Sequence, residues 1–210
     1  MRLVLVLVLA LAFAGVARAA PLEAVTLAPV ADESLPFWCD WGYDWDERCY
    51  WDDSDRLRVG GVENKVWRAG VRFSLDALPA DASVVTAELS LWYDGTCVGV
   101  ERRDAPCDGR AFEVDAHPIF TSRWRSEREV EFAPAAASAF LDAGAPAGRL
   151  AWEVTDVVAD WWSGGLANDG ILLKLADEEE GFGVSGPAFP SSGYPDASLR
   201  PRLTIWFVRE

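Results

Sequence analysis

The sequence has very few of the residues and motifs on which most enzymes depend. It contains one histidine, His117, so a Ser-His-Asp or Cys-His mechanism has a single imidazole available. It has no G-x-S-x-G, H-E-x-x-H or phosphate-loop pattern. Carboxylates are numerous enough for glycosidase chemistry, but one sequence does not reveal which of them face each other. We therefore expect a protein that is not an enzyme, with His117 as a structural or surface residue.

Positive charge is also scarce, because the formal net charge is -15 at pH 7 and the chain is poor in lysine. Such a surface repels phosphate backbones and anionic lipids, so nucleic acid is not an expected partner. Neutral glycans, cations and basic proteins fit better, whereas an anionic polysaccharide would need a local arginine cluster or a bridging metal. The basic residues that cluster in the sequence are read as solvated turn residues, with an anionic-sugar site as the alternative. They are Arg102, Arg103, Arg110, Arg123 and Arg125.

Long hydrophobic runs are confined to the start of the chain. Residues 3–13 carry no polar side chain and are followed by small residues up to Ala19, which is the layout of a secretory signal peptide over residues 1–19. The run is shorter than the roughly 20 apolar residues of a membrane helix, and later apolar runs are strand-sized. We expect cleavage after Ala19 and a secreted, extracellular protein with no membrane span.

The four cysteines form two pairs, and each pair encloses nine residues. In an exported chain this spacing predicts two local disulfides, Cys39–Cys49 and Cys97–Cys107, although four cysteines allow three pairings. Closing each loop would contribute roughly 2 to 3 kcal/mol to stability. A zinc site is the alternative, but zinc sites favour C-x2-C spacing.

From Arg56 onward, apolar and polar residues alternate with a period of two, which is typical of half-buried strands. The alanine-rich segment 135–141 instead predicts one or two helical turns. Thr155-Asp156 predicts the N-cap of a short helix over 157–162, with Gly164-Gly165 as its stop signal. The predicted strands are 56–59, 66–75, 85–93, 111–116, 129–132, 149–154, 170–176 and 202–208.

Many short strands and a single short helix predict an all-β fold, a jelly-roll-like β-sandwich with disulfide-closed loops. Residues 20–36 precede it as a linker or an edge strand. Residues 37–55 form an aromatic, acidic loop closed by the first disulfide, in one domain with the sandwich at 56–210. The tryptophans expected in the core are Trp152, Trp161 and Trp162.

Several strings occur in an order that matches a known family. The most specific is EVTDVVADWW at 153–162, followed by NDGILL at 168–173. Together the strings run from Asp55 to Val208 and resemble the DNRLRE domains. The resemblance implies a jelly-roll sandwich of bacterial extracellular proteins, related to carbohydrate-binding modules. The remaining matching strings are DRLRVG at 55–60, RFSL at 72–75, AELSL at 87–91 and RPRLTI at 200–205.

The aromatic, acidic loop 37–55 is not explained by that resemblance. Aromatic faces stack on sugar rings, and neighbouring carboxylates accept hydrogen bonds from hydroxyls. Alternatively, the tryptophans pack as a lid over one end of the sandwich. The carboxylates Asp44, Asp46 and Asp52 are candidate ligands for a structural Ca2+, the one cofactor considered, although no D-x-[DN]-x-[DN]-G ladder is present. The candidate ligand-binding residues are Trp41, Tyr43, Trp45, Tyr50 and Trp51.

These observations predict a secreted, non-catalytic module that binds extracellular carbohydrate or mediates surface adhesion. Its partner would be a polysaccharide or a cell-surface component. A second hypothesis is a structural or protein-interaction module of the bacterial envelope. The third is a carboxylate-based polysaccharide-degrading enzyme, which would need two facing carboxylates.

Overall fold

The computed structural model describes residues 20–38, 55–62, 65–98, 105–107, 109–121, 130–178 and 185–209. Within them the chain is mostly antiparallel strand, with the helix α1 (Thr155–Ser163) and the short 3-10 helix η3 (Ala197–Leu199). None of the described helices is both long enough and apolar enough to span a membrane. The strands are β1 (Glu23–Leu27), β2 (Pro29–Trp38), β3 (Arg56–Arg58), β4 (Gly60–Val62), β5 (Lys65–Phe73), β6 (Ala82–Tyr93), β7 (Thr96–Cys97), β8 (Ala105–Pro106), β9 (Phe112–Pro118), β10 (Ala137–Leu141), β11 (Gly148–Glu153), β12 (Ile171–Leu175), β13 (Ala188–Pro190) and β14 (Arg202–Arg209).

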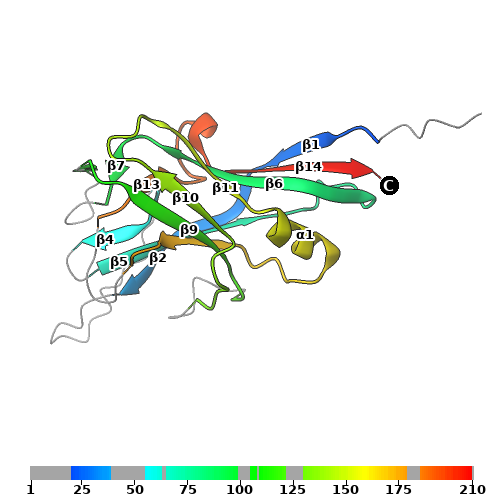
Figure 1. Cartoon of the computed structure of the whole chain (residues 1–210), viewed down its shortest axis with the longest axis horizontal. Coiled ribbons are helices and arrows are strands. Elements are labelled where there is room, and N and C mark those ends of the chain that lie inside the picture. Colours follow the sequence, from blue (N-terminus) through cyan, green and yellow to red (C-terminus); the bar gives the residue numbers. More distant parts are fainter. Residues whose placement is uncertain are drawn as a thin grey trace, which may run out of the picture.

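Two antiparallel sheets form the sandwich. The first sheet has the strand order β1-β14-β6-β11, and the second has the order β10-β9-β12-β5-β2, with β4 also pairing with β5. In Figure 1 the first sheet runs along the top of the molecule and the second lies below it. Strands from distant parts of the chain are neighbours, such as β1 beside β14 and β5 beside β12. This interleaving is that of a jelly roll with β2 added at one edge, and it confirms the predicted all-β fold class.

The core is made of the inward side chains of both sheets. On β6, for example, Leu89 and Leu91 are fully buried between the exposed Glu88 and the outward Trp92. Trp152 reaches from the first sheet across the core, where its Nε1 donates to the Val114 carbonyl of the second sheet at 2.7 Å. Trp152 and Trp161 are buried as predicted, and Trp162 is half-buried against the same core.

Helix α1 begins differently from the prediction. The prediction of an N-cap at Thr155-Asp156 is wrong, because the N-cap residue is Val154, which makes no side-chain capping hydrogen bond. The Thr155 hydroxyl instead accepts from the Ala87 backbone N–H at 2.8 Å, so it docks the helix on β6. The predicted stop is confirmed, since Gly164 is the C-cap in the left-handed conformation, φ 77°.

The prediction of helical turns at 135–141 is also wrong, because Ala137–Leu141 is strand β10 paired with β9. The side chains of Ala139 and Leu141 are buried, while those of Ser138 and Phe140, which alternate with them, are exposed. Pairing with β9 and burial on a period of two override the helix propensity of alanine. Of the predicted strand 129–132, Phe132 forms an isolated bridge with Ile119, and residue 129 lies outside the described residues.

The sequence predicted either a linker or an edge strand over residues 20–36. In the structure these residues contain β1 and most of β2. These strands lie at edges of the first and second sheets, respectively. β2 continues to Trp38, so it includes the first two residues of the predicted loop 37–55.

Gly186 lies where three chain segments meet at the end of the sandwich opposite α1. Its carbonyl accepts from the Val98 N–H at 2.9 Å, and the next carbonyl, of Pro187, accepts from the Val59 N–H at 3.0 Å. A Cβ atom at Gly186 would overlap the Val59 carbonyl oxygen and lie 3.1 Å from the Leu175 side chain. Only glycine fits between these segments without moving backbone.

We expect Gly186→Ala to lower the free energy of unfolding by at least about 2 kcal/mol, because a backbone carbonyl must shift to admit the methyl group. Urea unfolding of the purified protein measures this. Gly148→Ala is the control, since the nearest atom to its Cβ is 4.0 Å away. Equal stability of the two variants would contradict the close approach at Gly186.

Candidate functional site

The residues predicted from the aromatic loop lie outside the described residues. The chain is described up to Trp38, at the end of β2, and again from Asp55, just before β3. Of the five basic candidates, Arg110 is described, and it is exposed. The predicted aromatic, cysteine, carboxylate and arginine candidates that lie outside the described residues are Trp41, Tyr43, Trp45, Tyr50, Trp51, Cys39, Cys49, Asp44, Asp46, Asp52, Arg102, Arg103, Arg123 and Arg125.

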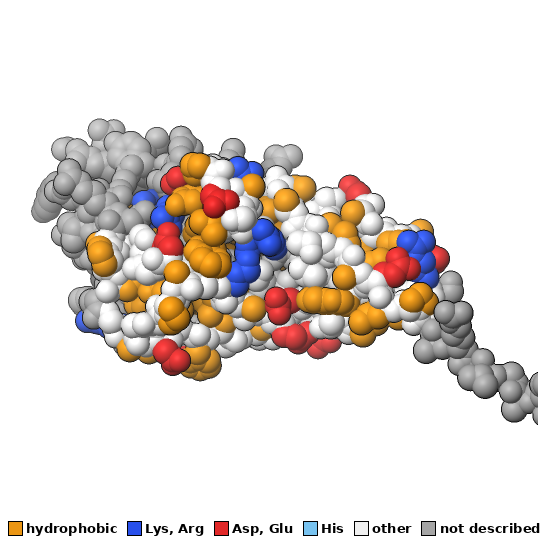
Figure 2. Space-filling view, turned by 90° about the horizontal axis from the view of Figure 1, so that it is seen from above, with side chains coloured by type: hydrophobic (Ala, Val, Ile, Leu, Met, Phe, Trp, Pro, Cys, Tyr) orange, Lys and Arg blue, Asp and Glu red, His pale blue; other side chains and the backbone are white. Residues whose placement is uncertain are grey.

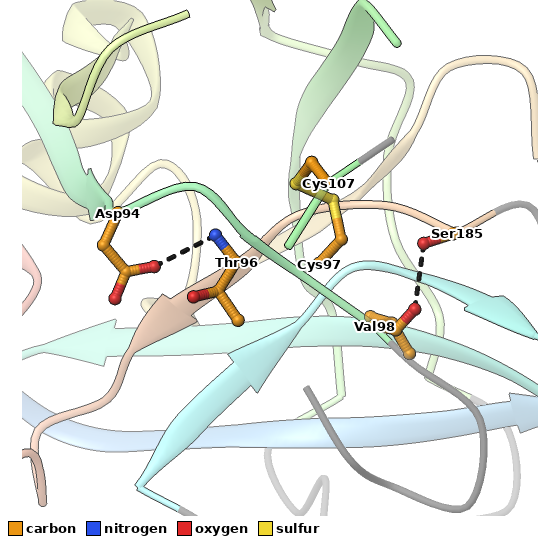
Figure 3. Close-up of a disulfide and its surroundings, with 6 residues drawn as sticks. All are labelled: Asp94, Thr96, Cys97, Val98, Cys107 and Ser185. Carbon is orange, nitrogen blue, oxygen red and sulfur yellow. Dashed lines mark hydrogen bonds between the residues drawn. A yellow bond between two sulfur atoms is a disulfide. The ribbon is translucent and has the colours of Figure 1, made fainter. Parts of the chain in front are cut away.

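The second predicted disulfide, Cys97–Cys107, is present (Figure 3). It starts from β7, which lies at the end of the sandwich away from α1 (Figure 1). The Cys107 N–H donates to the Gly95 carbonyl at 2.9 Å. Beside the disulfide, the Ser185 hydroxyl donates to the Val98 carbonyl at 2.9 Å. The bridge therefore fastens the β7–β8 hairpin next to the segment that leads into β13.

An ion pair joins two more segments at this end. Arg56 lies 2.7 Å from the Asp94 carboxylate, and its guanidinium sits over the Tyr194 ring at 5.0 Å. Burial raises the pKa of Asp94, but hydrogen bonds from Thr96 and Arg56 outweigh burial and hold that pKa below its usual range. These groups satisfy one another and support the fold rather than presenting a site.

We expect the double variant Cys97→Ala/Cys107→Ala to lose about 2 to 3 kcal/mol of stability, because the open loop regains entropy in the unfolded chain. Chemical unfolding under non-reducing conditions compares it with the parent protein. An unchanged unfolding midpoint would contradict a stabilising role for this bridge.

His117 is a buried residue on the outer side of the second sheet, in keeping with a structural role. Its Nδ1–H donates to the Ala133 carbonyl at 2.8 Å, and its ring packs edge-on against Phe132 at 5.0 Å. Burial lowers the pKa of His117, and the positive charges of Lys174 and Arg68 lower it further, against the opposing effects of Ala133 and Asp115. The ring is therefore held neutral near neutral pH.

Because the pKa of His117 is lower in the folded protein than in the unfolded chain, the unfolded chain takes up a proton first as the pH falls. Its contribution to stability is complete above the unfolded pKa of about 6.5 and is lost as the pH falls through the folded pKa. We expect stability to fall less between about pH 7.5 and pH 5 in His117→Asn than in the parent protein. Identical pH profiles in thermal unfolding would contradict this.

The outer face of the second sheet is partly covered by the chain itself. Leu35, Ile119 and Leu172 form a small buried cluster there, with Val130 and Phe132 packed against it. Nearby, Arg68 is buried in an ion pair with Glu178, with Nε to Oε1 at 2.9 Å. This part of the surface is closed by its own apolar and ionic contacts.

The outer face of the first sheet, here called the open face, is exposed instead. Residues directly opposite on neighbouring strands point the same way. One row crosses the sheet from β1 to β11, and its two threonine hydroxyls lie 3.2 Å apart. Half-buried Trp92 and Trp206 lie on either side of this row, at opposite ends of the face. The residues of the row are Thr26, Thr204, Glu88 and Glu153.

Arginines border the open face beside Trp92. Arg149, whose register partner is Trp92, donates to the Ser90, Ser198 and Arg200 carbonyls. Burial lowers the pKa of Arg149, and the neighbouring charge of Arg202 lowers it further, although a guanidinium stays protonated in proteins. Figure 2, which looks at the molecule from the side of this face, shows basic side chains gathered near the middle of the view, with acidic side chains on either side.

The open face combines aromatic, hydroxyl, carboxylate and guanidinium groups, which can stack on and hydrogen-bond to a ligand. Trp92 and Glu88 belong to the strand predicted at 85–93, but the sequence alone did not show that they share a face with residues of other strands. The same alternation that placed Leu89 and Leu91 inward could have assembled this face, had the strand order been known. Among the described residues, no group of three or more His, Cys, Asp or Glu side chains is placed to hold a metal ion.

Comparison with protein-family models gives no match for this chain, and comparison with curated proteins gives none either. The resemblance to the DNRLRE domains therefore stays a prediction from the residue strings.

Proposed function

We propose that this protein is a secreted, non-catalytic module that binds a carbohydrate chain, and that the open face of the first sheet is its binding surface. The observation that carries the proposal is the composition of this face. Trp92 and Trp206 lie on either side of a row of hydroxyls and carboxylates, and arginines border the face beside Trp92.

The spacing of the two tryptophans suits a chain rather than a single sugar. Trp206 is opposite Thr86 on β6, and Thr86 is six residues before Trp92. At about 3.3 Å per residue, the two indoles start roughly 20 Å apart along the strands. An extended oligosaccharide could contact both, with Thr204 as a hydrogen-bonding partner between them.

Secretion fits the same proposal. The disulfide Cys97–Cys107 suits an oxidising compartment, and residues 1–19 have the layout of a signal peptide. The alternative of a structural or protein-interaction module of the envelope shares these features, but it gives no reason for the mixture of aromatic and polar groups on the open face.

A carboxylate-based enzyme is less well supported by the described residues. Glu88 and Glu153 are opposite each other on β6 and β11, but both are exposed on an open sheet. A general acid for glycoside hydrolysis needs a raised pKa, which usually comes from burial in an apolar pocket. The open face therefore favours binding over hydrolysis.

We expect Trp92→Ala and Trp206→Ala each to weaken binding to a polysaccharide roughly tenfold, because each removes an aromatic face on which a sugar ring can stack. A glycan array identifies the ligand, and calorimetry on the purified protein measures the affinity. Phe140→Ala is the control, since this aromatic side chain is 69% exposed on the second sheet.

The predicted aromatic loop supplies the opposing variant, Trp41→Ala. If Trp41→Ala abolishes binding while Trp92→Ala and Trp206→Ala bind normally, the open face is not the site. If no glycan binds the parent protein with or without calcium, the proposed function is wrong.

A further inference from the structure

Three arginines meet where the open face borders the loop between β13 and β14. Arg149 comes from β11, Arg202 from β14 and Arg200 from the loop itself. The Nη2 atoms of Arg149 and Arg202 donate to the same carbonyl oxygen, that of Ser198, at 2.6 and 2.9 Å. Arg149 also donates to the Arg200 carbonyl at 3.2 Å. Two like charges are thus held side by side by one neutral acceptor.

Within the described part of the chain, much of the hydrogen-bonding capacity of these side chains is unused. A guanidinium has five N–H donors. Arg200 uses its Nε, which donates to the Tyr194 carbonyl at 2.8 Å, and Arg202 uses its Nη2. The protein therefore fixes the positions of Arg200 and Arg202 while leaving donors available on the half-buried outer side of each.

Among the described residues, no carboxylate forms an ion pair with any of the three arginines. Asp196 of the same loop is exposed, and its carboxylate accepts from the Ser198 N–H at 2.9 Å. That hydrogen bond, with a smaller effect of the Arg200 charge, lowers the pKa of Asp196.

Three other arginines of the described chain, Arg56, Arg68 and Arg209, are paired with acids. Arg56 pairs with Asp94, and Arg209 pairs with Glu23 at 3.0 Å. In a chain with a formal net charge of -15, carboxylates are abundant, so an arginine cluster without them is not forced by composition. An anion bound from outside would relieve the repulsion between Arg149 and Arg202.

We infer that the polysaccharide bound by the open face is anionic, and that Arg200 and Arg202 contact its carboxylate or sulfate groups. This inference rests on the proposed function, because it names the ligand class of the same face. Planar guanidinium groups bind such oxyanions with paired, charge-assisted hydrogen bonds.

The position of the cluster fits a charged sugar rather than a free anion. Trp92 and Arg149 are register partners on β6 and β11, and Arg202 is the partner of Ser90, two residues before Trp92. A sugar ring against the Trp92 indole would carry its acidic group toward the arginines. Arg149 is a positioning residue in this arrangement, since its Nη atoms already donate to backbone carbonyls.

The test is calorimetry with the exported protein and three polymers of similar length: a polyuronate, a sulfated polysaccharide and a neutral polysaccharide. We expect at least one anionic polymer to bind more tightly than the neutral one, with affinity that falls as salt is raised. Arg200→Gln and Arg202→Gln should each weaken that binding about tenfold. A preference between the two anionic polymers identifies the acidic group.

Arg209→Gln is the matched control, because it removes the same charge from β14 at a residue paired with Glu23. Its binding should change by less than about twofold. Equal binding by all three arginine variants, or tighter binding of the neutral polymer, would overturn the inference and leave glycan binding in place. No binding of any of the three polymers or of any arrayed glycan would instead overturn the proposed function.

Discussion

The side chain of Trp152 makes the contact on which the arrangement of the two sheets depends. It leaves β11 at the edge of the first sheet, crosses the core and donates to the Val114 carbonyl on β9 of the second sheet. Its ring also packs edge-on against Phe189, 6.3 Å away. A buried indole without an acceptor would be costly, so this bond fixes how β11 lies over β9. Because side chains alternate, fixing Trp152 inward also fixes its neighbours Ala151 and Glu153 outward.

The outward side chains then differ between the two sheets for a physical reason. On the second sheet, Leu35 and Leu172 point outward and must be buried, which the segment around Ile119 and Phe132 achieves. On the first sheet, the outward positions from Thr86 to Trp92 on β6 and from Arg202 to Trp206 on β14 hold polar or amphipathic residues that need no cover. Trp92 and Trp206 are much larger than the other outward side chains of these strands, and each is partly exposed to solvent. An aromatic residue kept there, outside the core, is available for a ligand.

The sequence predicted what depends on local pattern and missed what depends on pairing between distant segments. Alternation placed Leu89 inward and the glycine at 164 ended the helix, both as expected. Helical turns were predicted at Ala137 and Ala139 because helix propensity is a local property, whereas their pairing with β9 depends on a distant segment. The arginine cluster was missed for the same reason. Arg149 and Arg202 are 53 residues apart and become neighbours only through their shared flanking strand β6.

The net charge alone disfavours anionic partners, but the positions of the individual charges lead to a different expectation. At physiological ionic strength a charge is screened beyond about 8 Å, so a ligand responds to nearby groups more than to the total of -15. Near the arginines the field is positive, but Glu88 and Glu153 lie farther along the same face and Asp196 lies on the bordering loop. A polymer with closely spaced phosphates would meet those carboxylates as well as the arginines. A polysaccharide with widely spaced acidic groups could place one at the arginines and hydroxyls elsewhere, so under the proposed function this charge arrangement would favour an acidic glycan over nucleic acid.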